Sequence, residues 1–455
     1  MSTLYSPALA QTLAANLQQI RTQLAQLDAQ ALARQSGFLK RQPRKIPLSD
    51  FLLALVALAA EATLSLERIT AVVSLVTHRT YTKQALHKRL DATVENFLAQ
   101  VATALFGQLS NGLRTQGLFR PFRRVLLHDS TVQALPDHLA DLFPGSGNQR
   151  HKKRATLKIQ FIADLLNATL VHCSLSGFTR NDQAAAPEVL ALARRGDLLI
   201  RDLGYFVLPV LAALESKGIA FLSRFKHGVG VHDLNGQRLN LVWELKTHGR
   251  FDREVLLGDQ RVRARLVALP APEAVANERR RRARANRDQR LNPGREHLFL
   301  MGWSIFLTNV SREVWPAQSL AMVYRLRWRI EIIFKAWKSH LGLRQFNARS
   351  ASLLRLSVMT KLLFCVSVYR FCQALELLGQ GQRHVSLLRL ARIISQCACL
   401  FATAILQLSP QQWLEHHLTH HLFYEKRKDR KNYFELFAQV NARLAGTIQL
   451  NGHFE

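Results

Sequence analysis

The sequence predicts an α/β protein built of several domains. From residue 123 onward, short apolar runs of strand character alternate with helical stretches, an order typical of an α/β core. Residues 223–295 are richer in strand patterns, whereas residues 1–110 and those after 343 show the periodicity of amphipathic helices. The chain has 455 residues, 48% of them apolar, so it can build roughly two to four domains with sizeable cores.

The balance of charges predicts a polyanionic partner. The chain carries 62 Lys and Arg against 32 Asp and Glu, a formal net charge of +30. Such an excess attracts nucleic acid and is larger than an enzyme acting on small molecules needs. A basic protein of the ribosome or of a membrane surface is the alternative that charge alone leaves open.

The cysteines and the apolar runs predict a soluble, cytoplasmic protein. None of the five cysteines shows the paired C-x2-C spacing of a zinc site, so free thiols in a reducing compartment are expected. The sequence starts without the basic-then-apolar pattern of a signal peptide. The longest apolar runs, 51–60 and 397–408, fall short of the ~20 residues that span a bilayer.

Residues 1–115 are expected to be helical. A first helix should end at Gly37, and a second should run from Ser49 to about residue 62. Two shorter helices flank the polar sequence THRTYT, and the later one begins near Thr82 and carries several cations. This pattern fits a helix-turn-helix-like DNA-binding module and, equally, a helical bundle with a solvated basic face.

Two aspartates stand directly after strand-like runs. Strands are expected at 125–127, 157–166, 170–175 and 198–200, with a helix at about 184–194. Asp129 follows the first of these runs and Asp202 the last. The C-terminal ends of strands are where α/β folds place reactive groups. Taken alone, an aspartate after a strand is more typical of a helix cap or a turn.

Residues from about 223 to 295 are expected to form an antiparallel β-rich unit. Residues 261–269 alternate charged and apolar side chains with period two, and 242–249 and 251–258 have a similar texture. The unit contains the run ERRRRARANRDQR, from Glu278 to Arg290. Such a run is either a solvated, mobile segment or an arm that contacts phosphates. A further buried strand is expected at 298–309.

A helix from about residue 315 combines chemistry and packing. Tyr324, Arg327, Glu331 and Lys338 follow the spacing Y-x2-R-x3-E-x6-K, and at about 100° per residue they share one narrow stripe. A second stripe is apolar and should face the core: Ile330, Ile333, Phe334, Trp337 and Leu341. A carboxylate among cations can bind a metal while the cations bind an anion, which suggests phosphate chemistry. Taken alone, Glu331 could simply pair with Arg327 or Lys335.

Three carboxylates from separate elements could form one metal site. Asp129, Asp202 and Glu331 offer the hard oxygen ligands that Mg²⁺ prefers, with Mn²⁺ as a substitute. Two such ions about 4 Å apart would activate a water or a 3′-hydroxyl for phosphoryl displacement. A four-histidine cluster at 416–421, HHLTHH, has spacing for a transition metal. A polar helix face is the preferred interpretation.

The signature resembles that of the DDE transposases of bacterial insertion sequences, specifically the insertion sequence four family. The match at Tyr324, Arg327, Glu331 and Lys338 is complete. The resemblance implies an RNase H-like catalytic core interrupted by a β-rich insertion. The implied regions are a helical N-terminal DNA-binding region at 1–115, core at 120–206, the insertion at 207–296, core at 297–375 and a helical C-terminal region at 376–455. Leu203 stands where relatives often carry a basic or small residue, but Gly204 and Tyr205 remain in place.

The resemblance also implies roles for individual residues. Asp129, Asp202 and Glu331 would be the catalytic, metal-binding acids. Phosphates beside the cleaved strand would be held by Tyr324, Arg327, Lys335 and Lys338. Arg224 would contact DNA close to the site, and Trp328 would lie near the terminal nucleotide. Trp303 would stack on a flipped base, although a core tryptophan in an apolar strand explains it equally well.

The expected function is transposition of a mobile element. The protein would bind terminal inverted repeats in double-stranded DNA and act as a dimer in a synaptic complex. It would cut and paste by Mg²⁺-dependent strand hydrolysis and strand transfer, through a hairpin intermediate. The alternatives are a transposase-derived DNA-binding protein without catalysis and a Mg²⁺-dependent nuclease without strand transfer.

Overall fold

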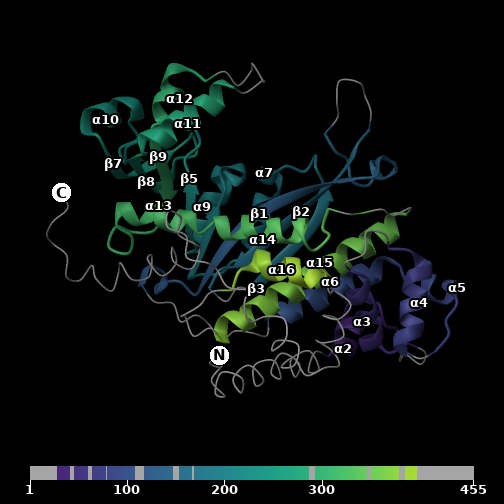
Figure 1. Cartoon of the computed structure of the whole chain (residues 1–455). Helices are drawn as coiled ribbons and strands as arrows, with labels where there is room; N and C mark the ends of the chain where they lie inside the picture. Colours follow the sequence, from purple (N-terminus) through teal and green to yellow (C-terminus); the bar gives the residue numbers. More distant parts are fainter. Residues whose placement is uncertain are drawn as a thin grey trace, which may run out of the picture.

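The computed structural model shows a mixed α/β protein, which confirms the predicted fold class at that level (Figure 1). It describes residues 28–40, 46–59, 64–77, 79–107, 117–146, 153–166, 169–285, 293–344, 346, 350–378 and 385–396. Among the predicted features, the HHLTHH cluster, Cys397, Cys399, Arg287 and Arg290 lie outside the described residues.

The described strands are β1 Arg124–Leu135, β2 Ala155–Asp164, β3 Thr169–Gly177, β4 Asp197–Arg201, β5 Ala220–Arg224, β6 Val231–His232, β7 Phe251–Leu257, β8 Val262–Pro270 and β9 Trp303–Thr308. The α-helices are α2 Ala29–Gln35, α3 Leu48–Leu58, α4 Leu66–Thr77, α5 Lys83–His87, α6 Ala92–Gly107, α7 Asp182–Ala185, α8 Val189–Leu192, α9 Leu208–Ser216, α10 Leu241–His248, α11 Glu273–Arg284, α12 Arg295–Leu300, α13 Ala317–Arg325, α14 Trp328–Ser339, α15 Ala351–Leu378 and α16 Leu387–Gln396. Short 3-10 turns are η1 Gly117–Phe119, η2 Asp137–Leu139, η3 Ala186–Glu188 and η4 Leu203–Tyr205.

All these strands belong to one sheet, in the order β3-β2-β1-β4-β5-β9-β8-β7-β6. Strands β1, β2 and β3 are antiparallel, whereas β4 and β5 run parallel to β1. From β5 onward the pairing is antiparallel again, through β9, β8, β7 and β6. Figure 1 shows β7, β8 and β9 with α10, α11 and α12 at one end of the sheet. The strands of the 207–296 segment therefore extend the sheet that carries Asp129.

Two apolar clusters cover the two faces of the sheet. Leu127 and Ile200 point into the first cluster, whereas Leu126 and Leu199 point into the second, as the period-two geometry of strands requires. The first cluster also contains side chains of α3, α6, α14, α15 and α16, and Figure 1 shows α14 across β1 and β2. The described N-terminal helices thus share a core with the sheet. Gly37 follows α2 with φ +77°, a helix-ending conformation, as predicted.

The DNA-binding module predicted near residue 82 stays a prediction. Helix α5 begins at Lys83, and Thr82 caps it by accepting a hydrogen bond from the Ala85 N–H at 3.3 Å. It packs against α4, so a short helix pair is present where it was expected. This arrangement suits both a DNA-binding module and a bundle with a basic face.

One stretch, Ser352–Tyr369 in α15, is long and apolar enough to cross a membrane by length and composition. Of that stretch, 78% is buried inside the protein, where α15 packs against α3, α6 and α16. Arg355 and Lys361 interrupt it, so no continuous apolar run marks it in the sequence. Its burial is that of a core helix.

Two strand predictions were wrong. Residues 242–248 belong to helix α10, and Gly249 directly follows it. At the start of the helix the Asn240 side chain accepts from the Trp243 N–H at 3.0 Å, and Gly249 ends the helix with φ +66°. These caps outweigh the alternating texture. The run 298–309 is split between α12 and β9, because a short apolar run does not distinguish helix from strand.

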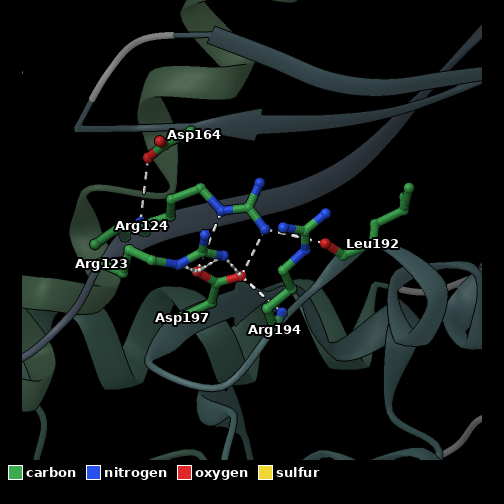
Figure 2. A network of polar contacts seen from close by, with 7 residues as sticks. Arg123, Arg124, Asp164, Leu192, Arg194 and Asp197 are labelled. Atoms are coloured by element: carbon green, nitrogen blue, oxygen red, sulfur yellow. Dashed lines mark hydrogen bonds and ion pairs between the residues drawn. The ribbon is translucent and has the colours of Figure 1, made fainter. Parts of the chain in front are cut away.

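Figure 2 shows the network that joins β1 to β4 at their N-terminal ends. The carboxylate of Asp197 is fully buried and accepts from the guanidinium of Arg123 at 2.9 Å and of Arg124 at 2.6 Å. It also accepts from the Arg194 N–H at 2.8 Å. Arg124 and Asp197 are register partners in the parallel pair. This network therefore ties the two strands in one register, five residues before Asp129 and Asp202 respectively (129 − 124 = 202 − 197).

Candidate active site

Asp129 and Asp202 lie side by side where β4 leaves β1. The parallel pairing of these strands ends at His128 and Arg201, so the two aspartates occupy the next position in each chain. The prediction that Asp129 follows the end of its strand was wrong, because β1 continues to Leu135 through its pairing with β2. The apolar run at 125–127 corresponds only to the part of β1 whose side chains are buried on both faces of the sheet. It is β4 that ends here.

The predicted single helix is two helices. Helix α13 ends at Arg325 and α14 begins at Trp328. Between them, the Arg327 N–H bonds the Tyr324 carbonyl at 3.1 Å, and the Ile330 N–H bonds the Arg327 carbonyl at 3.1 Å. Each of these hydrogen bonds joins an N–H to the carbonyl three residues earlier, which makes a tight turn of 3-10 type. The predicted apolar stripe from Ile330 to Leu341 is buried throughout.

The guanidinium of Arg327 stands among the three predicted acids. Its Nη1 lies 3.0 Å from Oδ2 of Asp129, and its Nη2 lies 2.6 Å from Oε1 of Glu331. Its Nε lies 3.9 Å from Oδ1 of Asp202. The Tyr324 hydroxyl donates to the same Asp202 oxygen at 3.3 Å. The structure thus brings Asp129, Asp202 and Glu331 together from β1, the end of β4 and α14.

Burial is the largest single influence on the pKa values of Asp129, Tyr324 and Arg327. It raises the pKa of Asp129 from 3.8 to about 6, although Arg327 and the Ser130 N–H oppose the shift. The neighbouring carboxylates of Asp202 and Glu331 add to it. Burial lowers the pKa of Arg327, but Tyr324 and the three carboxylates outweigh it and raise that pKa overall. Burial also raises the pKa of Tyr324, so the phenol stays protonated and donates.

The predicted DNA-binding residues surround the acids unevenly. The Lys338 ammonium donates to the Val132 carbonyl at 2.9 Å, whereas Lys335 is exposed. The Arg224 guanidinium lies 6.0 Å from the centre of the Tyr324 ring. Since Tyr324 bonds Asp202, Arg224 is linked to that aspartate through the tyrosine. Trp328 directly follows Arg327 and is 56% exposed, so its ring is available to a ligand.

Trp303 lies farther along the sheet than Arg224. It is the first residue of β9, opposite Pro270 of β8, whereas Arg224 pairs with Phe306 three residues later. Its side chain is partly buried against the second apolar cluster, and its ring centre lies 6.3 Å from that of Phe299. The core interpretation thus accounts for part of the ring, and its role in DNA binding stays a prediction.

The arginine run divides into packed and solvated residues. Arg279 donates to the carbonyls of Trp303 at 3.0 Å and Met301 at 3.4 Å, and Arg280 donates to that of Leu298 at 3.1 Å. These two residues fasten α11 to α12 and β9. Arg281 and Arg282 are exposed and pair with Glu278 on the same helix. The described part of the run is therefore an ordered helix.

A polar layer behind the aspartates was missed in the sequence. Asp182 accepts from the buried Lys158 ammonium at 2.8 Å and from the Ser130 hydroxyl at 2.8 Å. Gln160 donates to the same carboxylate at 3.2 Å and accepts from the Tyr205 hydroxyl. Ser130 follows Asp129, so by strand alternation the layer lies on the opposite face from the acids. The signal was there: Lys158 and Gln160 alternate with apolar residues inside a buried strand.

Gly204 and His128 complete this layer. A Cβ on Gly204 would lie 3.1 Å from Oδ2 of Asp182, which gives the glycine two residues after Asp202 a packing reason. The His128 ring packs on Tyr205 with centres 4.1 Å apart. Burial lowers the pKa of His128 well below 6.5, so this ring is neutral. Polar groups therefore support the aspartates from behind.

The chemistry of the acids suits a divalent cation, but the guanidinium of Arg327 lies between them. Three carboxylates supply the hard oxygens that Mg²⁺ and Mn²⁺ take. Among the residues that the structure describes, however, no three His, Cys, Asp or Glu side chains are grouped closely enough to bind an ion. The guanidinium of Arg327 separates the carboxylates. A metal would need that group to move.

Comparison with known proteins agrees with the geometry. The sequence model of the family described as "Transposase DDE domain" matches residues 120–366, a range that includes all three acids. The transposase for insertion sequence element IS231D of Bacillus thuringiensis subsp. finitimus is 28% identical over 382 residues, which cover 78% of this chain and 79% of that protein. The transposase for insertion sequence element IS1151 of Clostridium perfringens is 24% identical over 339 residues, 69% of this chain and 71% of that protein.

A shorter match joins them. The putative transposase InsL for insertion sequence element IS186A of Escherichia coli (strain K12) is 33% identical over 102 residues, 22% of this chain. The resemblance to DDE transposases of insertion sequences is thereby confirmed. Because the family model covers more than half of the chain, the protein belongs to the transposase DDE domain family, whose members are metal-dependent enzymes that cleave and transfer DNA strands.

Proposed function

We propose that this transposase binds the terminal inverted repeats of its own element and moves the element by cut-and-paste transposition through a hairpin intermediate. The observation that carries the proposal is the meeting of Asp129, Asp202 and Glu331 around Arg327. Three acids from separate elements, gathered on one face at the end of β4, are what a metal-dependent phosphoryl transfer site requires.

The residues around the acids would hold and orient the DNA. Tyr324 donates to Asp202, so it orients this carboxylate and leaves the Asp129 side to Arg327. Arg224, Lys335 and Lys338 would neutralise phosphates beside the cut strand, because all three cations lie on elements that border the acids. Exposed Trp328 offers a ring face on which a terminal base can stack.

The acids would hold two Mg²⁺ ions, with Mn²⁺ as a substitute. Bound there, such ions lower the pKa of an attacking water or 3′-hydroxyl and stabilise the leaving oxygen. The protein contributes orientation: the Asp197 network sets the register of β1 and β4, and the layer around Asp182 supports β1 and β2 from behind.

The regions would divide the work. Residues 120–206 and 297–375 would form the RNase H-like core, which the strand order β3-β2-β1-β4 supports. Residues 207–296 would be the insertion, whose strand β5 pairs with β4 and β9 of the core. Residues 1–115 would bind DNA, and 376–455 would form the helical C-terminal region. We further propose a dimer in the synaptic complex, and action in the cytoplasm at the nucleoid.

Cleavage of labelled element ends tests the proposal. Duplexes carrying the terminal repeats are incubated with Mg²⁺ and wild-type, Asp202→Ala or Glu331→Ala protein, with Glu273→Ala, on the exposed start of α11, as the control. Wild type and the control should produce nicks, hairpins and strand-transfer products, and the two site variants should bind without cutting.

Each other outcome has a meaning. Nicks without joined products would favour a nuclease, and binding without any cleavage by wild type would favour a DNA-binding protein that has lost catalysis. Identical products from wild type and both site variants would refute the assignment of the acids.

A further inference from the structure

Arg327 occupies the position from which a cation would serve all three acids. Its guanidinium bonds Asp129 at 3.0 Å and Glu331 at 2.6 Å and faces Asp202 at 3.9 Å. The side chain is only 12% exposed. It is therefore an internal counter-ion, in addition to any contact that it makes with DNA.

This arrangement and a bound metal exclude each other. Carboxylate oxygens lie 2.0–2.1 Å from Mg²⁺, so they must converge on a small ion. Here they are held apart around a planar group much larger than an ion. Consistent with this, none of the acids in the described part of the chain forms a group of three close enough to bind a metal.

Electrostatics favours Arg327 among the acids, but hydrogen bonding favours its transfer to a phosphate. Three carboxylates gathered on one face repel one another unless a cation stands between them. The guanidinium, however, leaves its buried Nε without a hydrogen-bond partner. A phosphate offers two oxygens to the fork of an arginine and matches its geometry. DNA can therefore satisfy Arg327 better than the acids do.

We propose that Arg327 is an exchangeable resident cation: it neutralises the acids before metal binds, and it transfers to a DNA phosphate as metal enters. This rests on the proposed metal site. The consequence is positive coupling between DNA binding and metal binding. DNA that binds Arg327 leaves the carboxylates available to metal, and metal that binds the carboxylates leaves Arg327 available to DNA. By linkage, DNA must raise the affinity for metal by the same factor as metal raises the affinity for DNA.

Mn²⁺ binding to the full chain tests the proposal. The dissociation constant is measured by electron paramagnetic resonance, without DNA, for wild type, Arg327→Gln and Arg327→Lys. The matched control is Arg325→Gln. Arg325 is exposed and lies two residues before Arg327, so this change removes the same charge away from the acids. Arg327→Gln should bind Mn²⁺ about tenfold more tightly than wild type, Arg327→Lys should lie between them, and the control should stay close to wild type. Equal or weaker binding by Arg327→Gln, or the same gain in the control, overturns the proposal.

Wild type alone provides a second test that needs no variant to fold. A duplex carrying an element end should tighten Mn²⁺ binding, and Mn²⁺ should tighten duplex binding by an equal factor. Absence of coupling overturns the proposal. Failure of the site itself is distinguishable: if Asp202→Ala and Glu331→Ala bind Mn²⁺ as wild type does, the acids are not the metal site. If they lose binding while Arg327→Gln is unchanged, only the role of Arg327 fails.

Discussion

Tyr324 contacts one of the three predicted acids through its hydroxyl. Its phenol donates to Asp202 at 3.3 Å, while its ring packs against Phe306 of β9 at 5.5 Å between centres. The ring contact keeps the hydroxyl near the carboxylate.

Removing that hydroxyl is the first test at this scale. Tyr324→Phe keeps the ring and loses one hydrogen bond worth about 1 kcal/mol, so we expect strand cleavage to slow about fivefold. Single-turnover cleavage of an element end measures the rate, and Glu273→Ala, on the exposed start of α11, is the control. An unchanged rate would mean that the hydroxyl does not orient Asp202.

Asp129 gives the site a pH-dependent cost in the metal-free protein. Burial raises its pKa from 3.8 to about 6, so the folded chain holds this proton more tightly than the unfolded chain. The corresponding stability is fully present below about pH 3.8 and is lost as pH rises through about 6. Two pKa units correspond to about 3 kcal/mol.

Asp129→Asn cannot ionise and should escape that loss. In a chelator, its melting temperature relative to wild type should rise between about pH 4 and pH 6 and then stay constant. Thermal unfolding across this range measures the difference. A difference that does not change with pH would show that Asp129 titrates as it does in the unfolded chain.

At the residue scale, the sequence indicated the three acids that the structure brings together. Glu331 was marked by its spacing, Asp202 by the end of β4 and Asp129 by the apolar run before it. The sequence did not suffice for Asp182 and Lys158. Their ion pair joins α7 to β2, a tertiary contact that no local sequence pattern predicts. Only the alternation of Lys158 with apolar residues indicated a buried polar side chain there.

Among the elements, β1 and β4 matter most, since their register decides whether Asp129 faces Asp202. A one-residue slip would turn one aspartate to the other face of the sheet. The buried Asp197 carboxylate, with Arg123 and Arg124 bound to it, opposes that slip.

Asp197→Ala should therefore weaken the pair. Loss of a buried carboxylate leaves two arginines without their partner and should cost about 3 kcal/mol, seen as a lower melting temperature and faster hydrogen exchange in β1 and β4. Asp141→Ala, which breaks an exposed pair with Lys153, is the control and should change neither. Unchanged exchange in β1 and β4 would contradict the role of Asp197.

Element boundaries were predictable only where local signals dominate. Gly37 and the buried stripe of α14 follow from capping and periodicity. The length of β1 does not, because its polar half is a strand only through pairing with β2. The break between α13 and α14 likewise has no proline or glycine to announce it.

At the scale of the whole molecule, the net charge of +30 dictates how DNA binding responds to salt. A protein that contacts roughly 6–10 phosphates loses about 10³–10⁵ in affinity between 50 and 200 mM salt. We expect a loss in this range for a duplex carrying an element end.

One lysine should be visible in that dependence. Lys335→Gln should reduce the slope of log affinity against log salt by about 1, whereas Glu273→Ala should not reduce it. Fluorescence anisotropy at several salt concentrations measures both. An unchanged slope for Lys335→Gln would mean that this lysine contacts no phosphate.

Strand order is the whole-molecule feature least accessible from sequence. The attachment of β9 to β5 joins residues 222–224 to 306–308, a separation over which no periodicity or capping signal acts. The fold class and the polyanionic partner could be predicted because composition and element order are properties of the whole chain.

In the mechanism that we propose, Asp129, Asp202 and Glu331 share one metal site. Fe²⁺ bound in place of Mg²⁺, with ascorbate and peroxide, cuts the backbone next to the ion, and mass spectrometry locates the cuts. We expect cuts near 129, 202 and 331 that excess Mg²⁺ suppresses and that Glu331→Ala abolishes. Cuts at only one of these segments, or cuts elsewhere that Mg²⁺ suppresses equally, would contradict it.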